Sequence, residues 1–257
     1  MRTIVKTLSV LMVFIGIQTQ MQAQAPASIP EKPEMILVEG GTFTMGSYSG
    51  RDDEQPTHQV TLNSFQIGKY PVTVGQYKAF VEATGRSMPD APSWGWQDKH
   101  PMVNVNYNDA VAYCNWLGEK YGGDWRLPTE AQWEYAARGG QKSRGYTYAG
   151  GNDLWDAGWY ADNAGGQTQS VGRKKANELG IHDMTGNVWE WCADWYDKDY
   201  YSNSPSTNPR GPSRGSYRVL RGGSWDSSAA NCRVAHRAGD TPSSRHTFYG
   251  FRVVLSQ

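Results

Sequence analysis

The chain has 257 residues, in which 25 lysines and arginines balance 25 aspartates and glutamates. This balance gives no support for nucleic acid or a membrane surface as a general partner. The hydrophobic content of 38% is enough for a sizeable core, and the unusual totals are 29 glycines, 11 tryptophans and 15 tyrosines. So many glycines predict many turns and little regular secondary structure, and the aromatic side chains must then supply much of the buried area.

The beginning of the chain has the three-part layout of a secretory signal peptide. A basic start (Arg2, Lys6) precedes an apolar run at residues 8–17 and small residues at 21–25. The run is too short to span a bilayer, and no cysteine follows it to carry a lipid anchor. We therefore expect a signal peptide at 1–23, a flexible leader at 24–33 and one domain at 34–257. The mature protein, without a transmembrane segment, is expected in the periplasm, at the cell surface or outside the cell; a buried N-terminal helix is the alternative.

The first predicted elements are strands. Residues 35–45 (MILVEGGTFTM) have an apolar run, a Gly40-Gly41 turn and an alternating segment, which together predict a β-hairpin. Residues 58–65 alternate in the manner of a further strand.

Three helices are predicted after these strands. The first follows Pro71-Val72-Thr73 and extends to residue 81, and the second covers residues 106–121 with one broad apolar face. The third begins after Thr129, which can cap its amino end, with Gln132 completing an approximate capping box. Glycines and turns dominate residues 139–180.

The last forty residues have a layout of their own. Two stiff blocks, YRVLRGGSW at 217–225 and GFRVVL at 250–255, enclose a polar and aromatic middle. That middle, residues 226–249, contains no Lys, Glu, Gln, Met or Trp, although these residue types are common elsewhere in the chain. We interpret the arrangement as two scaffold segments that present a display surface.

Six blocks in fixed order carry a family resemblance. They are VEGGTFTMGS, EQPTHQVTLNSFQIGKYPVT, WRLPTEAQWEYAARGG, GNVWEW, RVLRGGSW and GFRVV, and they extend over about residues 34–255. Together they resemble the formylglycine-generating enzyme family, whose members carry a sulfatase-modifying factor domain. The resemblance implies an α+β fold, poor in regular structure and related to C-type lectin-like domains. A fold alone does not assign a reaction.

The chemistry of that family depends on two cysteines five residues apart, which bind copper(I) during the oxidation of a sulfatase cysteine by O₂. The second cysteine position matches Cys232, but the first matches Ser227. A hydroxyl is a poor ligand for copper(I), which prefers thiolates. Ser224 and Trp189 match the family's pocket, whereas Phe248 replaces an asparagine. We therefore expect no copper and assign no catalytic residue.

The three cysteines allow several pairings. Cys114 matches a family half-cystine whose partner position holds Val253, so we expect a buried free thiol there. Cys192 and Cys232 are candidates for a disulfide in an exported protein. Other arrangements, including three free thiols, remain open.

The resemblance also implies calcium as a structural cofactor. One site would use the side chains of Asp183 and Glu190 with the carbonyls of Gly186 and Val188, a mixture of hard oxygen ligands that suits Ca²⁺. A second site would begin at Asn163 and Ala164, but its other ligands lack counterparts. The alternative for the first site is a glycine turn with two solvated carboxylates.

The composition of residues 226–249 points to display. An AAC or AAT codon with freely replaced adenines cannot encode the five missing residue types. The stretch therefore resembles the variable proteins of diversity-generating retroelements; the alternative is the ordinary polar loop of a non-enzymatic family member.

We expect an exported protein that binds a protein or small ligand without catalysis, the alternative being a formylglycine-generating or related oxidase acting on sulfatase cysteines. The predicted ligand contacts are Trp225, Asp226, Ser227, Ser228, Ala230, His236, Asp240, Ser243, His246, Phe248 and Tyr249.

Overall fold

The computed structural model describes residues 32–256, so the predicted signal peptide and most of the predicted leader lie outside the described residues. The fold is α+β, as expected. The helices are α1 (Val74–Thr84), α2 (Tyr107–Tyr121), α3 (Glu130–Ala137) and α4 (Leu154–Ala157). The strands are β1 (Met35–Val38), β2 (Gly41–Met45), β3 (His58–Leu62), β4 (Phe65–Gly68), β5 (Trp125–Arg126), β6 (Trp189–Trp195), β7 (Arg218–Arg221), β8 (Arg237–Asp240), β9 (Tyr249–Gly250) and β10 (Val254–Ser256).

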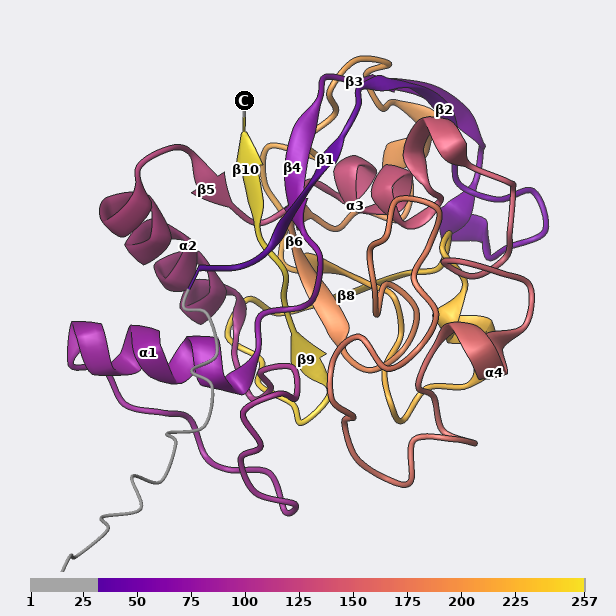
Figure 1. The fold of residues 1–257 in the computed structure, drawn as a ribbon. Helices are drawn as coiled ribbons and strands as arrows, with labels where there is room; N and C mark the ends of the chain where they lie inside the picture. The colour runs from indigo at the N-terminus through magenta and orange to yellow at the C-terminus, as the bar shows by residue number, and fades with distance from the viewer. Residues whose placement is uncertain (1–31, 257) are drawn as a thin grey trace, which may run out of the picture.

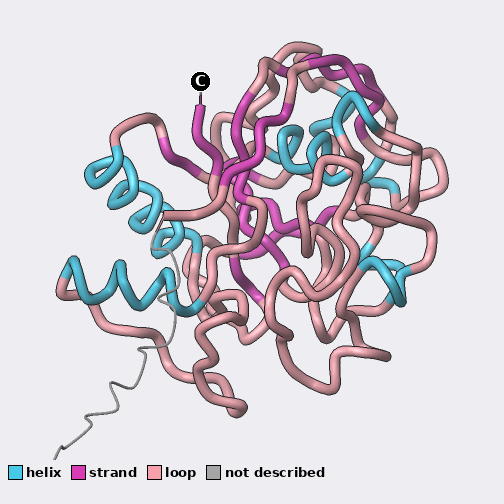
Figure 2. Tube along the Cα trace, in the orientation of Figure 1, coloured by secondary structure: helices cyan, strands magenta, loops and turns pink. Residues whose placement is uncertain are grey.

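The strands form three small sheets, with the orders β1-β4-β10-β5, β2-β3 and β8-β7-β6-β9. Helices α1 and α2 lie together on one side of the molecule, and α3 lies between the sheets (Figure 1). Loops make up much of the trace, as the glycine content predicts (Figure 2). The C-terminal strand β10 sits between β4 and β5, which ties the end of the described chain to its beginning.

The predicted hairpin at residues 35–45 is wrong. Both halves are strands, but β1 pairs antiparallel with β4 and β2 pairs antiparallel with β3, so they belong to different sheets. The chain changes sheets at Gly40, whose N–H donates to the Ser64 hydroxyl at 2.9 Å instead of closing a two-residue turn. A side chain at Gly40 would come within 2.5 Å of the Leu62 carbonyl, so the glycine here permits close approach of two backbones.

The three predicted helices are confirmed, and each begins with a capping box. The Thr73 hydroxyl accepts from the Gln76 N–H, the Asn106 side chain accepts from the Asp109 N–H, and Thr129 pairs with Gln132 in the same way. These local bonds satisfy amide groups that have no partner within the helix. Helix starts could therefore be placed from sequence to within one residue.

Aromatic rings fill the core, as the composition predicts. Tyr113 of α2 lies 5.4 Å from Phe251 and 5.5 Å from Phe80, measured between ring centroids. Trp133 and Trp191 are fully buried. Such edge-to-face contacts add to the burial of area and help to fix one arrangement of an otherwise loop-rich chain.

Buried ion pairs hold α3 against the C-terminal sheet. Arg221 contacts Glu134 at 2.5 Å and Glu130 at 3.3 Å, and Arg237 makes two bonds to Glu130 at 2.6 and 2.9 Å. All four residues are at most 2% exposed. Charges so deeply buried persist only when paired and hydrogen-bonded, so these contacts fix the positions of β7 and β8.

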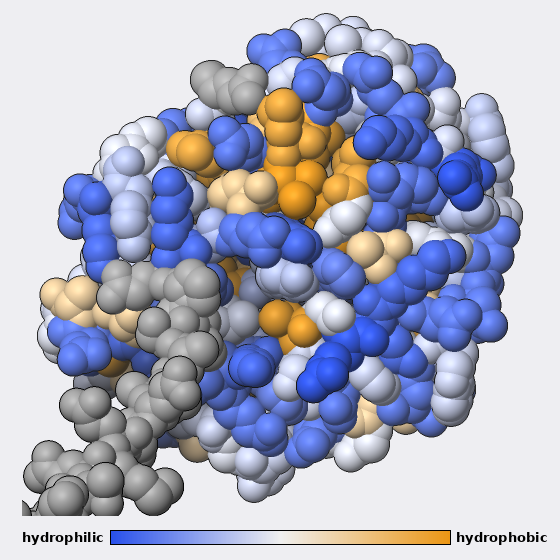
Figure 3. Space-filling model, viewed as in Figure 1, coloured by the Kyte–Doolittle hydropathy of each residue, from blue (hydrophilic) through white to orange (hydrophobic). Residues whose placement is uncertain are grey.

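The visible surface is mainly polar, with an apolar area over the β1, β4 and β10 part of the first sheet (Figure 3). Leu37 of β1 is 45% exposed. Within residues 32–256 no helix combines the length and the hydropathy needed to cross a bilayer.

Candidate ligand-binding face

The C-terminal loop face comprises residues 225–249, which follow β7, include β8 paired antiparallel with β7, and end at β9. Strand β6 lies at the centre, paired antiparallel with β7 and parallel with β9. The Trp189 N–H donates to the Phe248 carbonyl at 2.8 Å, and the Asn104 N–H donates to the His246 carbonyl at 3.0 Å. Backbone bonds therefore hold the loops, while their exposed side chains take no part in this pairing.

Four of the predicted contacts form one cluster. The His246 ring stacks on Phe248 with centroids 4.8 Å apart and meets Tyr249 edge-on at 4.7 Å. The Tyr249 hydroxyl donates to Asp240 Oδ2 at 2.8 Å, and burial, followed by that bond, raises the pKa of Tyr249. His246 is exposed and Phe248 half-buried, whereas Tyr249 is 9% exposed. Tyr249 therefore lies on the buried side of the cluster, and the rings of His246 and Phe248 form its accessible side.

Trp225 lies beside this cluster. Its indole N–H donates to the Thr247 carbonyl at 3.0 Å, and its ring meets Trp94 edge-on at 5.4 Å. Sequence reasoning missed Trp94, because it belongs to the distant loop before α2 and carries no motif. The face also has exposed small and polar residues, namely Asp226, Ser228, Ala230 and Ser243.

Two predicted contacts lie below the surface. His236 is 4% exposed, packs against Trp189 at 5.7 Å and has its Nδ1 3.6 Å from Glu54 Oε1. Burial acts to raise the pKa of Glu54, but His236 and Arg233 outweigh it and hold that pKa below its ordinary value. Because it packs into this buried group, His236 is not part of the accessible face. Ser227, at 6% exposed, is covered as well.

Ser227 and Cys232 both lie next to Ser224. The Ser224 N–H donates to Ser227 Oγ at 3.0 Å, and the two hydroxyl oxygens are also 3.0 Å apart. Burial raises the pKa of the Cys232 thiol to about 12, although the Ser224 backbone acts to lower it. The position matching the first family cysteine therefore holds a hydrogen-bonded hydroxyl, and the second holds a protonated, fully buried thiol.

The proposed disulfide between Cys192 and Cys232 is wrong. Both residues, and Cys114, are buried free thiols. Burial raises the pKa of all three, so they are poor nucleophiles. The expectation of a free thiol at Cys114 is confirmed. Cys192 and Cys232 are unpaired as well, and both are buried in the core.

The residues expected to bind calcium do not fit a calcium site as they are arranged. Both oxygens of Glu190 are taken by Arg252, at 2.6 and 2.7 Å, and Trp133 donates to the same carboxylate at 2.7 Å. The Asp183 oxygens accept from the Gly172 N–H at 2.7 Å and the Asn187 amide at 3.3 Å. Glu190 is thus the partner of a buried arginine rather than a solvated carboxylate.

Three other oxygens of the expected calcium sites are also engaged. The Gly186 carbonyl accepts from the Val188 N–H at 2.9 Å, Asn163 Oδ1 accepts from the Tyr160 N–H at 2.9 Å, and the Ala164 carbonyl accepts from the Gln169 side chain at 2.8 Å. No group of three or more His, Cys, Asp or Glu side chains suited to a metal ion occurs among residues 32–256.

Comparison with known proteins decides the family. Residues 20–257 match the sulfatase-modifying factor enzyme 1-like domain. The chain belongs to this family. It is 36% identical over 293 residues to the formylglycine-generating enzyme of Streptomyces coelicolor, an alignment that covers 88% of this chain and 91% of that enzyme. The family expected from the six sequence blocks is therefore confirmed.

Members of the family also occur under other names. The serine/threonine-protein kinase pkn1 of Chlamydia pneumoniae is 35% identical over 255 residues, which are 90% of this chain. This chain spans only about two fifths of the length of the chlamydial kinases that it matches. The solved structure of Treponema denticola variable protein 1 is 30% identical, with a TM-score of 0.77 over 87% of this chain and 95% of that one. The likeness to a variable protein thus extends over the whole domain.

Proposed function

We propose that this protein is an exported binding protein that holds its ligand on the C-terminal loop face and does not oxidise sulfatase cysteines. The observation that carries the proposal is the hydroxyl of Ser227, which hydrogen-bonds Ser224 at the place where copper chemistry needs a thiolate. The layout of residues 1–23 supports export. The Treponema variable protein supports the use of this fold for display.

The face has the composition of a binding surface. Half-buried rings of Trp225 and Phe248 offer apolar area at a small cost in side-chain entropy, since each has only two rotatable bonds. Exposed Asp226, Ser228 and Ser243 surround them with groups that form hydrogen bonds in several directions. Central aromatic anchors within a polar rim are the usual anatomy of a protein interface.

Several bonds hold the loop backbone without using these side chains, apart from the bond of the Trp225 indole to the Thr247 carbonyl. Arg245 makes an ion pair with Asp109 and donates to the Asn104 carbonyl, while the Tyr107 N–H donates to the Pro242 carbonyl. Substitutions at the exposed positions would leave those bonds in place. This separation between fixed backbone and replaceable side chains supports a diversified face.

A peptide-library selection on the immobilised protein tests the binding surface. Selected peptides should lose at least about tenfold in affinity for Trp225→Ala and Phe248→Ala, because aromatic anchors carry most of the binding energy. The matched control is Leu37→Ala, which removes an exposed apolar side chain from β1 in another sheet. Equal affinity for all four proteins would refute the location of the face.

Copper(I) uptake tests the absence of oxidase chemistry. The wild-type protein should bind no copper(I) in competition with a chelator and should leave a CxPxR peptide unoxidised. Ser227→Cys should gain copper(I) binding, since it puts a second sulfur where the hydroxyl now contacts Ser224. Turnover by the wild-type protein that is lost in Cys232→Ser would establish the oxidase alternative.

A further inference from the structure

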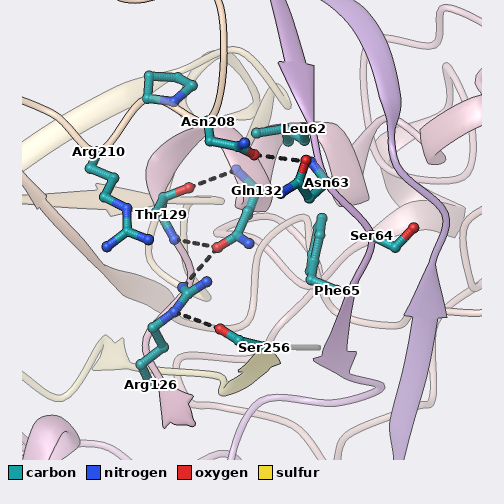
Figure 4. Close-up of a pocket in the computed structure, with 11 residues that line it drawn as sticks. Leu62, Asn63, Ser64, Phe65, Arg126, Thr129, Gln132, Asn208, Arg210 and Ser256 are labelled. Carbon is teal, nitrogen blue, oxygen red and sulfur yellow. Dashed lines mark hydrogen bonds between the residues drawn. The ribbon is translucent and has the colours of Figure 1, made fainter.

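A cavity lies away from the C-terminal loop face. It has a volume of about 200 Å³ and opens between the β3–β4 turn, the start of α3 and the loop after residue 207 (Figure 4). Its lining consists of Leu62, Asn63, Ser64, Phe65, Arg126, Thr129, Gln132, Asn208, Pro209, Arg210 and Ser256. None of these residues belongs to 225–249, so the cavity is independent of the proposed ligand face.

The lining contains two arginines and no carboxylate. Arg126 is held in place, because its Nε donates to Ser256 Oγ at 3.2 Å and one terminal nitrogen donates to Gln132 Oε1 at 2.8 Å. Arg210 is exposed, and its side chain has no hydrogen-bond or ion-pair partner among residues 32–256. Figure 4 shows its guanidinium without a bond to the other residues drawn.

The charges of the two arginines are only partly balanced. Asp124 Oδ2 lies 3.6 Å from Arg126 Nε and offsets that guanidinium from outside the cavity. Burial lowers the pKa of Arg126, Asp124 raises it, and the positive charge of Arg210 lowers it again. The two guanidiniums therefore repel one another. Arg126 has the carboxylates of Asp124 and Asp194 near it, so the unbalanced positive charge of the cavity is that of Arg210.

The loop that carries Arg210 is fixed to the sheet. The Thr61 N–H donates to the Ser206 carbonyl at 2.7 Å, and the Asn208 N–H donates back to the Thr61 carbonyl at 2.9 Å. In addition, the Asn63 N–H donates to Asn208 Oδ1 at 2.9 Å. Because this wall is built before any ligand arrives, binding would cost little loop ordering.

The amino end of α3 does not account for the site. The capping box engages the Thr129 and Gln132 N–H groups, and the Glu130 N–H donates to Asp194 at 2.9 Å. The recognition of an anion therefore rests on the arginine side chains. Leu62 and Phe65 also line the cavity but are only 3% and 1% exposed, so its accessible surface is mainly polar.

We propose that this cavity binds a small monocarboxylate, whose carboxylate contacts Arg126 and Arg210. The Arg210 guanidinium presents paired N–H donors that match the two oxygens of a carboxylate, whereas Arg126, whose first terminal nitrogen also donates to the Leu127 carbonyl at 3.0 Å, can offer its second terminal nitrogen. One excess positive charge suits a monoanion better than a phosphate dianion.

Calorimetric titration with benzoate at constant ionic strength tests the proposal. Benzoate should bind the wild-type protein saturably, and benzamide, its neutral counterpart, should bind at least about tenfold more weakly because it lacks the charge. Arg210→Ala should weaken benzoate binding by a similar factor. Arg214→Ala removes the same charge from the same loop at an exposed position outside the cavity and should bind benzoate as the wild-type does.

Three outcomes would overturn the proposal. They are equal binding of benzoate and benzamide, equal losses in Arg210→Ala and Arg214→Ala, and tighter binding of inorganic phosphate than of benzoate. Because Arg210 is exposed and unpaired, its replacement should leave the thermal midpoint unchanged, which separates lost binding from lost folding. Failure here would leave the proposal for the C-terminal loop face intact.

Discussion

Replacement of Glu190 by Gln should strongly destabilise the protein. Glu190 is fully buried and accepts two bonds from Arg252 and one from Trp133, all between 2.6 and 2.7 Å. Glutamine offers one acceptor oxygen and no charge, so Arg252, itself 0% exposed, keeps its charge without a counter-ion. Breaking one side of a buried pair costs about 3–5 kcal/mol. At about 2–4 °C per kcal/mol for a chain of this size, the thermal midpoint should fall by about 6–20 °C.

Thermal unfolding of this variant, followed by near-ultraviolet circular dichroism with excess calcium and with a chelator, is the assay. The ion-pair role predicts the same loss in both conditions. Glu119→Gln, on the exposed side of α2, is the matched control and should leave the midpoint unchanged. A loss confined to the calcium-containing sample would make Glu190 a calcium ligand. A fall of less than about 2 °C in both samples would refute the ion-pair reasoning.

Three further predictions concern stability. Tyr249→Ala should lower the free energy of urea unfolding by about 3–5 kcal/mol, because Tyr249 is buried and packs on Trp191. Phe248 is only half-buried, so Phe248→Ala should cost clearly less, and equal losses would contradict this difference in burial. Burial raises the pKa of Asp194 from 3.8 to about 7. The folded state then holds a proton that the unfolded chain releases, so unfolding free energy should fall as pH rises between those values, and Asp194→Asn should flatten the slope. Thr129→Ala should cost about 1 kcal/mol by removing the α3 cap, and an unchanged urea midpoint would contradict this.

Local signals in the sequence were sufficient for the helices and for the family. The start of α3 was predicted from a cap and its partner three residues apart, that of α1 from Thr73 after a proline, and that of α2 from its apolar face. The structure shows that all three starts have the same local cap. The exchange of β1 and β2 between sheets could not be predicted in this way. It depends on pairing with β3 and β4, which lies beyond any local turn signal.

Sequence reasoning did not predict the buried ion pairs. Glu190 looked like a solvated carboxylate or a calcium ligand, because acidic residues are rarely buried and the sequence does not show which arginine faces them. His236 was placed on the binding face for its residue type, although the fold turns it toward Glu54. The aromatic cluster at Phe248 and Tyr249 was foreseen because those rings lie close together in the chain and need only a short loop to meet.

Buried ion pairs and backbone bonds hold the C-terminal region, and its exposed side chains lie outside both. Arg237 reaches from β8 to Glu130, and Arg252 reaches from the segment before β10 to Glu190, so both ends of the C-terminal region are fixed inside the core. The loops between them also form backbone bonds, in which the Phe248 and His246 carbonyls accept from the Trp189 and Asn104 N–H groups. On the proposed binding face, a change at an exposed position such as Asp226 or Ser228 would therefore alter the ligand contacts without removing a group that the core requires.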